Sequence, residues 1–545
     1  MKRFRMDVDG MTCDSCNRHV ARVLAGAGAA DVAADWRRGE ATFSAEEEDV
    51  PRLADSVRES GYGPGTVALL ETSRAGPRRS AGGGADYDLL AIGSGGAAFA
   101  AAIRATNLGA KVALVERDTV GGTCVNTGCV PSKNLLAAAE AYHTAGHHPF
   151  DGISTRQVNT DLAQLVGMKD QVVEFLRGWK YEDLAKEYGF EIIQGQARFS
   201  GPDAVSVDGR EIRADHYLVA TGASPWAPPI PGLEEAGYPN STTAMELDRR
   251  PLRMVVIGGN YIGLEMGQLF ARLGTTVTVI EALDRLAPLE EPEVSSWITR
   301  VFEDEGIHAI TSARIVRVER TGDRRSVYLD DGRCFDAEQV LVATGRRPNV
   351  EGLGLEAAGI ELTERGAIRV DDELRTTNSR VFAGGDVTGA PQFVYVAAAH
   401  GTLAADNTVA GAHRQVDYTA MPRVTFTEPQ IAAVGLTDEE ANRQGHDCEC
   451  RVVELEHIPR PLVNRDTRGA FKIVAERGTG KILGVHVIGA NAGDVIIGAV
   501  YAVKFGLRVE DLANTWAPYL TMSEGLKLTA QSFTADVDKL SCCAA

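Results

Sequence analysis

Eight of the nine cysteines in this 545-residue sequence fall into close pairs, and paired thiols are its clearest capacity for chemistry. The pairs are Cys13/Cys16, Cys124/Cys129, Cys448/Cys450 and Cys542/Cys543, and Cys334 stands alone. Two neighbouring thiols bind soft metal ions or exchange electrons by opening and closing a disulfide. Because no export signal is evident at the start of the sequence, the pairs favour metal or redox chemistry in a cytoplasmic protein over an extracellular disulfide framework.

The composition narrows the classes of partner. Lys and Arg number 56 against 75 Asp and Glu, a formal net charge of −19, which argues against nucleic acid or an anionic membrane as the main partner. The longest apolar stretch, residues 89–103, is broken by glycines and predicts a strand and a helix rather than a membrane span. At about 150 residues per domain, the length predicts three to four domains.

The first cysteine pair lies in a segment with its own pattern of elements. Residues 1–70 predict the order βαββαβ, and the GMTCDSC motif at residues 10–16 places Cys13 and Cys16 at the entry to the first helix. A helix N-terminus favours thiolates, but the spacing alone fits half a zinc site, a redox dithiol or a soft-metal site. Motif and element order together resemble heavy-metal-associated domains, and this resemblance implies that both cysteines bind a metal ion.

Two segments carry the pattern of dinucleotide binding, and the first follows an apolar strand at residues 87–92. There, Gly93 permits a tight turn, Gly95 lets the backbone approach a pyrophosphate, and the small Ala98 lets the helix pack on the strand. Glu116 ends the next strand about 20 residues later, where a carboxylate accepts a ribose hydroxyl.

The second such segment repeats the strand, turn and helix with Gly258 and Gly263. Asn260 stands where a middle glycine is usual, and we expect it to adopt the left-handed turn that Asn tolerates. Glu281 ends the following strand, where an acid accepts a ribose 2′-hydroxyl and repels a 2′-phosphate. We therefore expect NADH to serve at least as well as NADPH, although Arg285 could compensate the charge.

The second cysteine pair lies in the GGTCVNTGCVPSK segment at residues 121–133. Two cysteines five residues apart can close a small ring where Gly128 lets the backbone bend, and Lys133 favours a thiolate. The segment resembles the redox-active disulfide of the flavin disulfide reductases, a similarity that covers about residues 86–545. It implies bound FAD, with Cys129 against the flavin and Cys124 facing substrate.

The same resemblance assigns roles along the chain. It implies that Tyr261 gates the flavin face and that Glu265 pairs with Lys133. It places the FAD at Gly93, Gly95, Ala98, Glu116, Gly122, Thr123, Lys133, Ala197, Asp386 and Val394. It places NADPH or NADH at Gly258, Tyr261, Gly263 and Glu281.

The expected architecture is α/β, with two Rossmann-like domains and an α+β dimerisation domain after a small ferredoxin-like βαββαβ domain. The expected ranges are 1–70 for the heavy-metal-associated domain, 71–85 for a flexible linker, 86–222 with 350–419 for FAD, 223–349 for NAD(P)H, 420–538 for dimerisation and 539–545 for a dithiol tail. A homodimer follows from this resemblance.

The C-terminal region bears on the substrate. Thiol-handling relatives carry a histidine in the segment that here reads YLTMSE at residues 519–524, and Tyr519 takes its place. A phenol with a pKa near ~10 is a poor proton shuttle at neutral pH, which disfavours disulfide substrates. With the Cys542/Cys543 tail, the chain is similar to mercuric reductases.

That similarity implies a route for mercury. NAD(P)H reduces FAD, FAD reduces the Cys124–Cys129 disulfide, and Hg(II) bound as a thiol complex is reduced there to Hg(0). Tyr181 and Tyr519 line the metal site, Cys13 and Cys16 help to deliver the ion, and the Cys542/Cys543 tail serves the partner subunit.

Two other functions remain open on the sequence alone. A thioredoxin-reductase-like enzyme also carries a C-terminal dithiol, although Tyr519 argues against it. A metal chaperone or buffer with a vestigial flavin domain is opposed by the intact dinucleotide motifs. The remaining cysteines and three histidines are interpreted as structural: Cys334, Cys448, Cys450, His400, His457 and His486.

Overall fold

The computed structural model describes residues 2–11, 14–36, 38–70 and 85–539. Cys13, the linker at 71–84 and the Cys542/Cys543 tail lie outside the described residues, so the predictions made for them stay predictions. The chain divides into two compact units, Met1–Ala85 and Asp86–Ala545.

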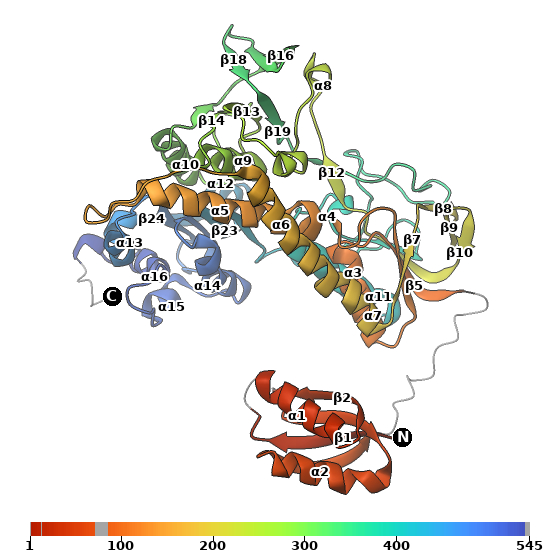
Figure 1. Cartoon of the computed structure of the whole chain (residues 1–545). Coiled ribbons are helices and arrows are strands. Elements are labelled where there is room, and N and C mark those ends of the chain that lie inside the picture. The colour runs from red at the N-terminus through yellow and green to blue at the C-terminus, as the bar shows by residue number, and fades with distance from the viewer. Residues whose placement is uncertain (1, 12–13, 37, 71–84, 540–545) are drawn as a thin grey trace. The chain divides into compact units, whose positions relative to one another are not determined.

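The N-terminal unit is a four-stranded antiparallel sheet with two helices, shown in red in Figure 1. Its elements are β1 (Lys2–Asp9), α1 (Asp14–Gly26), β2 (Ala30–Asp35), β3 (Glu40–Ala45), the 3-10 helix η1 (Glu47–Asp49), α2 (Val50–Glu59) and β4 (Gly63–Leu70). Alternate residues of β1, namely Phe4, Met6 and Val8, point into the core, as the two-residue period of a half-buried strand requires. The predicted βαββαβ order is confirmed.

The larger unit begins with a five-stranded parallel sheet of order β21-β11-β5-β6-β7. Its strands are β5 (Tyr87–Ile92), β6 (Val112–Glu116), β7 (Glu191–Gln194), β11 (Ala214–Val219) and β21 (Val381–Ala383). Helices α3 (Gly96–Asn107) and α11 (Val394–Val409) pack closely together on this sheet. A small antiparallel sheet of β8 (Ala197–Gly201), β9 (Ala204–Val207) and β10 (Arg210–Ile212) adjoins it. Because β21 returns from far along the chain, this first α/β unit is discontinuous in sequence.

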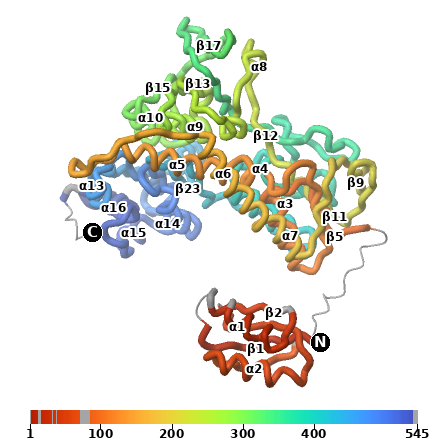
Figure 2. The backbone as a smooth tube through the Cα atoms, viewed as in Figure 1, coloured from red at the N-terminus to blue at the C-terminus, as the bar shows by residue number. Residues whose placement is uncertain are grey.

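Between β6 and β7 the chain forms a helical excursion that carries the second cysteine pair. It contains α4 (Gly122–Thr127), α5 (Cys129–His147), α6 (Leu162–Arg177), the π-helix η2 (Gly178–Glu182) and α7 (Asp183–Tyr188). Figure 2 shows α5 continuing from α4 toward the second α/β unit while α6 runs back toward α3. The excursion therefore spans the first and second α/β units.

The second α/β unit is a parallel sheet of order β15-β14-β13-β19 with helices beside it. Its elements are β13 (Arg253–Ile257), α9 (Tyr261–Arg272), β14 (Thr276–Ile280), α10 (Pro292–Asp304), β15 (His308–Ile310) and β19 (Gln339–Val342), with an antiparallel sheet of β16 (Ile315–Thr321), β17 (Arg324–Leu329) and β18 (Cys334–Ala337). The paired strands β12 (Ala223–Pro225) and β20 (Arg346–Pro348) carry the chain to and from this unit. Short helices α8 (Leu233–Ala236) and η3 (Thr243–Glu246) follow β12, and η4 (Asp386–Thr388) follows β21.

The C-terminal unit is an antiparallel sheet of order β22-β23-β26-β25-β24, drawn in blue in Figure 1. Its strands are β22 (Pro422–Thr425), β23 (Gln430–Gly435), β24 (Cys448–Glu454), β25 (Ala470–Glu476) and β26 (Ile482–Gly489). Its helices are α12 (Asp438–Arg443), η5 (Leu455–His457), α13 (Pro459–Asn464), α14 (Ala492–Lys504), α15 (Val509–Asn514), α16 (Glu524–Gln531) and η6 (Val537–Lys539). The predicted α/β class with an α+β unit at the end is confirmed. Over the described ranges, every helix is too short or too polar to cross a lipid bilayer.

The contact between α3 and α11 depends on one glycine. A Cβ atom on Gly401 would lie 2.0 Å from the backbone oxygen of Ala97, which is far inside van der Waals contact. The two helices approach this closely only because position 401 has no side chain.

We therefore expect Gly401→Ala to lower the free energy of unfolding by about 1–3 kcal/mol, because the helices must separate to admit the methyl group. Thermal melts followed by circular dichroism measure this change. Gly167→Ala is the matched control, since Gly167 lies in α6 with no atom near its Cβ position. It should leave the melting temperature unchanged or raise it. Equal melting temperatures for the two variants would contradict this account of the contact.

Candidate active site

Two thiols meet where α4 passes into α5. Cys124 lies in α4, Cys129 is the first residue of α5, and both are free thiols that hydrogen-bond to each other. Gly128 makes the bend between them possible, because a Cβ there would lie 2.9 Å from the backbone oxygen of Thr123. The structure therefore brings together the two cysteines that the sequence predicts to form a redox pair.

The two thiols differ in acidity. The hydrogen bond from Cys124 lowers the pKa of Cys129, and the Lys133 ammonium lowers it further. The hydrogen bond to Cys129, together with burial, raises the pKa of Cys124. Cys129 therefore carries the negative charge of the pair, and the thiolate sits at the N-terminus of a 19-residue helix, which also favours an anion.

Lys133 is held by a buried carboxylate from the second α/β unit. Its Nζ donates to Oε2 of Glu265 at 2.8 Å, and it lies over the ring of Phe426, 4.5 Å from the centroid. Oε1 of Glu265 accepts the backbone N–H of Phe426 at 2.9 Å. The expected Lys133–Glu265 pair is present, and Phe426 is a third member that no sequence motif indicated.

Tyr181 lies near the two thiols. It lies in the π-helix η2, packs edge-to-face on Phe99 with ring centroids 4.7 Å apart, and approaches the turn at Gly121. Burial raises the pKa of Tyr181, and the charges of Cys124 and Cys129 raise it further. A π-helical turn is a rare feature that often marks functional sites. The sequence pattern did not reveal this turn.

Arg346 is a second cation beside the pair. Its Nη2 donates to Thr123 Oγ1 at 3.4 Å and also to the backbone oxygen of Ala223. Burial lowers the pKa of Arg346, while the charges of Asp386 and Cys129 oppose that shift. Burial likewise raises the pKa of Asp386. Arg346 was not identified from the sequence, although it lies in the ATGRRPN segment at residues 343–349. In this segment the chain leaves the second α/β unit through β20.

The turn before α3 forms a cradle that fits a flavin dinucleotide. Gly93 has φ +106, and a Cβ there would lie 2.5 Å from the backbone oxygen of Ala220. A Cβ on Gly122 would lie 2.6 Å from the Cα of Gly95, so backbone packs on backbone and the N–H groups opening α3 stay accessible. Glu116 is buried at the end of β6 and accepts the Ser94 hydroxyl at 2.5 Å.

The other expected FAD residues surround this cradle. Ala98 is fully buried in α3, Ala197 is buried at the start of β8, and Val394 opens α11 against Gly96. His400 holds the loop before Asp386, because the backbone N–H of Gly385 donates to its Nδ1 at 3.1 Å. Burial lowers the pKa of His400 to about 4, so the ring is neutral and can accept this hydrogen bond.

The turn before α9 repeats this geometry with one correction. Gly258 has φ +108, and a Cβ on Gly263 would lie 1.8 Å from the backbone oxygen of Gly258. Asn260 is extended at φ −109, so the expected left-handed Asn is wrong: the left-handed residue is Gly258. Among the residues that the structure describes, none donates to the buried Oδ1 atom of Asn260, which therefore offers an acceptor beside the helix start. Glu281 accepts the N–H of Gly259 at 2.7 Å.

Arg285 and Tyr261 are both held by neighbours near this turn. Arg285 donates to the backbone oxygen of Pro288 at 3.2 Å, which directs its charge toward its own loop. Tyr261 donates its hydroxyl to Glu290 at 3.1 Å, and Arg423 donates to the same carboxylate at 3.2 Å. Glu290 and Arg423 are positioning residues for Tyr261 that the sequence did not reveal.

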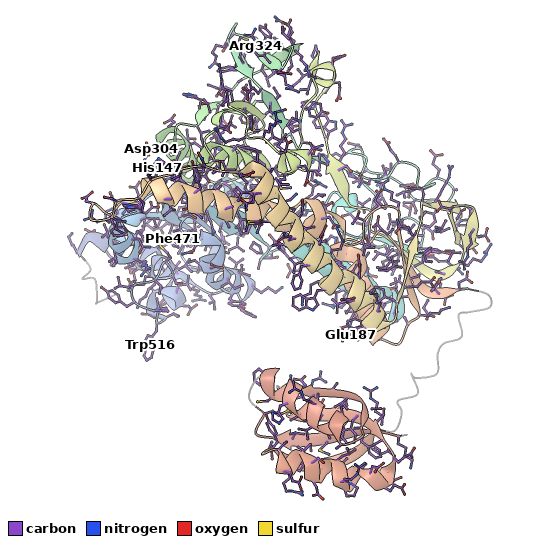
Figure 3. All side chains as sticks on the ribbon, viewed as in Figure 1. His147, Glu187, Asp304, Arg324, Phe471 and Trp516 are labelled. Carbon is purple, nitrogen blue, oxygen red and sulfur yellow. The ribbon has the colours of Figure 1, made fainter. Side chains whose placement is uncertain are left out.

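One predicted metal-site residue, Tyr519, lies apart from Tyr181 within the larger unit, and another, Cys16, belongs to the N-terminal unit. Tyr519 is 51% exposed in the loop before α16, and α15 and α16 are well separated from α4 in Figure 1. Tyr519 therefore does not join Tyr181 within one chain. The neighbouring Trp516, labelled in Figure 3, is 95% exposed. Cys16 is partly buried in α1 of the N-terminal unit.

The acidity of Cys129 yields a test. In the reduced protein, iodoacetamide should label Cys129 with an apparent pKa below the ~8.5 of an ordinary thiol. Lys133→Met removes the nearby cation and should raise that pKa by on the order of one unit, which slows labelling at neutral pH. Labelling rates from pH 5 to 10 measure this pKa, and peptide mass spectrometry identifies the labelled cysteine. Lys186→Met is the control, because Lys186 is exposed and pairs with Asp183. A pKa unchanged by Lys133→Met would contradict this electrostatic account.

Comparisons with known proteins agree with this geometry. Residues 87–401 match the pyridine nucleotide-disulphide oxidoreductase family, residues 421–530 match its dimerisation domain, and residues 5–63 match the heavy-metal-associated domain. Among solved structures, the Cu(II) complex of the flavoprotein disulfide reductase RclA from Escherichia coli superposes with a TM-score of 0.75 at 30% identity, over 82% of this chain and 99% of that one. LpdA from Mycobacterium tuberculosis gives a TM-score of 0.74 at 28% identity, over 82% and 100%.

Curated relatives match over nearly the whole sequence. The mercuric reductase of Bacillus cereus is 48% identical over all of this chain and 87% of its own length. That of Staphylococcus aureus is 46% identical over 99% of both chains, and that of Streptomyces lividans is 53% identical over 84% of this chain and 98% of its own. With its two cradles, its thiol pair and its heavy-metal-associated unit, the chain belongs to the mercuric reductase family of pyridine nucleotide-disulphide oxidoreductases.

Proposed function

We propose that this protein reduces Hg(II) to Hg(0) at Cys124 and Cys129 with electrons from a pyridine nucleotide. The observation that carries the proposal is the thiol pair itself. One member is stabilised as a thiolate by Lys133, and both lie beside Tyr181 and the first cradle. Soft thiolates bind soft ions, and Hg(II) is one of the softest.

The chain's own residues bind the ion and hold charge around it. Cys129 supplies one thiolate, and Cys124 supplies a second when its proton leaves on metal binding. When bound, FAD at the first cradle and NAD(P)H at the second would supply the two electrons that convert Hg(II) to Hg(0). Lys133 and Arg346 stabilise the negative charge that gathers at the thiols as these electrons arrive. The neutral atom has little affinity for thiolate and leaves.

We also propose the domain roles expected from the sequence. Residues 86–222 with 350–419 hold FAD, residues 223–349 hold the nicotinamide nucleotide, and residues 420–538 form the dimer. Helix α14 supports the last assignment, because Ile497, Tyr501 and Phe505 recur every four residues and leave an exposed apolar stripe. We propose that a second copy of the chain covers this stripe, and that Tyr519 and the Cys542/Cys543 tail of one subunit serve the thiol pair of the other.

The purified holoenzyme should oxidise NAD(P)H when Hg(II) is supplied with excess thiol, and it should release mercury vapour in proportion. Oxidised glutathione, lipoamide and thioredoxin should support little turnover, because no histidine stands at position 519 to protonate a leaving thiolate. Anaerobic absorbance assays with each acceptor measure this. Brisk disulfide turnover without response to mercury would favour the disulfide-reductase alternative. Absence of turnover with every acceptor would favour a metal-binding protein.

The tail has a separate test. Cys542→Ala with Cys543→Ala should lose turnover of tightly chelated Hg(II) while NAD(P)H still reduces the flavin, because the relay but not the redox site is removed. Steady-state assays with a dithiol chelator, against stopped-flow flavin reduction, measure both. Cys334→Ala is the matched control, since Cys334 is an exposed thiol on β18. Unchanged turnover of the chelated metal would refute a relay role for the tail.

Nucleotide preference follows from Glu281. Its carboxylate is buried at the end of β14, where it accepts backbone N–H groups of Gly259 and Leu283. NADH should therefore give a kcat/KM at least equal to that of NADPH. Glu281→Gln removes the charge but keeps the shape, and it should raise kcat/KM for NADPH relative to NADH. A strong NADPH preference in the unaltered enzyme would overturn this interpretation.

A further inference from the structure

A second cluster of metal-ligating side chains lies in the C-terminal unit. Cys448 and Cys450 stand two residues apart on the edge strand β24, so their side chains leave the same face of the sheet. Asp438 opens α12, which packs beside this strand. One ligand atom from each of the three residues lies within 4.8 Å of the other two. Two thiols and a carboxylate therefore converge on one point.

The carboxylate of Asp438 is held in place by hydrogen bonds. Its Oδ1 accepts a hydrogen bond from Asn442 Nδ2 at 2.8 Å and another from the Cys448 thiol at 3.1 Å. The backbone N–H of Asp438 donates to Glu291 at 2.7 Å, and Thr437 and Glu440 form a capping box that fixes the start of α12. The donor is thus oriented before any ion arrives.

Ordinary packing explains only part of this arrangement. Cys448 and Cys450 both pack against the apolar cluster of Ala441, Val474 and Leu483, as small apolar side chains would. Apolar packing gives no reason for a fixed carboxylate beside two sulfur atoms. All three residues are only partly buried, so solvent ions can reach them.

We propose that Asp438, Cys448 and Cys450 bind a thiophilic divalent cation of the zinc, cadmium and mercury class. Metal–sulfur bonds of ~2.3 Å place two sulfur ligands about 3.8 Å apart in a tetrahedral site and about 4.6 Å apart in a linear one. Both separations are shorter than 4.8 Å, the distance within which all three ligand atoms lie of one another. Three protein ligands leave a fourth position for water. Binding breaks two S–H bonds and releases two protons to solvent.

The charges around the site are compatible with a cation. Three basic groups lie around the site, and each is paired with a carboxylate. The Nζ of Lys472 is neutralised by Glu291 at 2.9 Å and Glu293 at 3.0 Å. Arg477, which donates to the backbone oxygen of Cys448 at 3.2 Å, pairs with Asp447 at 3.1 Å. Arg451, which donates to the backbone oxygen of Cys450 at 2.9 Å, pairs with Glu449 at 2.5 Å. Strand β24 is well separated from α4 in Figure 1, so an ion here is out of reach of Cys124 and Cys129. The site holds its cation without reducing it, and the bound cation links α12 to β24.

The full-length, FAD-loaded protein tests this with Cd(II) chloride as the probe, because Cd(II) binds thiolates. Each variant is reduced, desalted without oxygen and dialysed against Cd(II), and bound metal per chain is measured by atomic emission. Cys448→Ser with Cys450→Ser should bind one Cd(II) fewer than the unaltered protein. Cys334→Ser, the matched control, should bind as many as the unaltered protein.

Asp438→Asn keeps both thiols and provides a second test that holds even if the double variant misfolds. It should bind Cd(II) at this site at least tenfold more weakly, and the rise in melting temperature caused by Cd(II) should shrink. Hg(II) turnover should persist in every variant, which separates this site from the proposed reducing site. Unchanged Cd(II) stoichiometry in the double variant, or unchanged affinity in Asp438→Asn, would overturn the proposal.

Discussion

The ion pair between Lys133 and Glu265 is the interaction on which the rest of the site depends. Lys133 stands one turn beyond Cys129 in α5, and Glu265 comes from α9 of the second α/β unit. The same carboxylate accepts the N–H of Phe426 beside the C-terminal unit. One buried carboxylate thus joins three parts of the chain around the thiols. A buried charge is stable only when it is paired. Removal of either Lys133 or Glu265 would therefore leave the other as an unpaired charge and destabilise the protein.

The thiol pair beside this ion pair has unequal members. The hydrogen bond from Cys124 lowers the pKa of Cys129 most, and the charge of Lys133 lowers it further, while the charge of Glu265 opposes the shift. The hydrogen bond to Cys129 and burial raise the pKa of Cys124. A soft ion arriving at such a pair meets one ligand already charged. Tyr181 closes one side with a phenol, and Arg346 adds a second cation near Thr123. The two ring nitrogens of His400 are engaged by Gly385 and Tyr418, and position 519 carries a tyrosine in place of the histidine that disulfide reductases use.

The sequence predicted the two cradles and the thiol pair. It did not predict several residues of the site, and there are physical reasons for each. Glycine spacing and strand alternation predicted both cradles, because a backbone that must approach a phosphate or another backbone excludes a side chain at Gly93 and Gly258. The conformation of Asn260 was predicted wrongly, because the motif shows that Asn260 is unusual but not which residue of the turn is left-handed.

Glu290, Arg423 and Phe426 were missed because they reach the site from distant segments. The π-helical turn at Tyr181 depends on local packing that no periodicity records. Cys448 and Cys450 were interpreted as structural from the sequence, because Asp438 joins them only in three dimensions.

The central claim is that Hg(II) receives its electrons at Cys124 and Cys129 and at no other thiol pair. The most direct measurement is mercury vapour released in a single anaerobic turnover by the full-length holoenzyme that carries Cys124→Ala and Cys129→Ala with every other cysteine intact. The account predicts that NAD(P)H still reduces the flavin while vapour release falls to the level of buffer alone. Vapour release at a rate near that of the unaltered enzyme would contradict it.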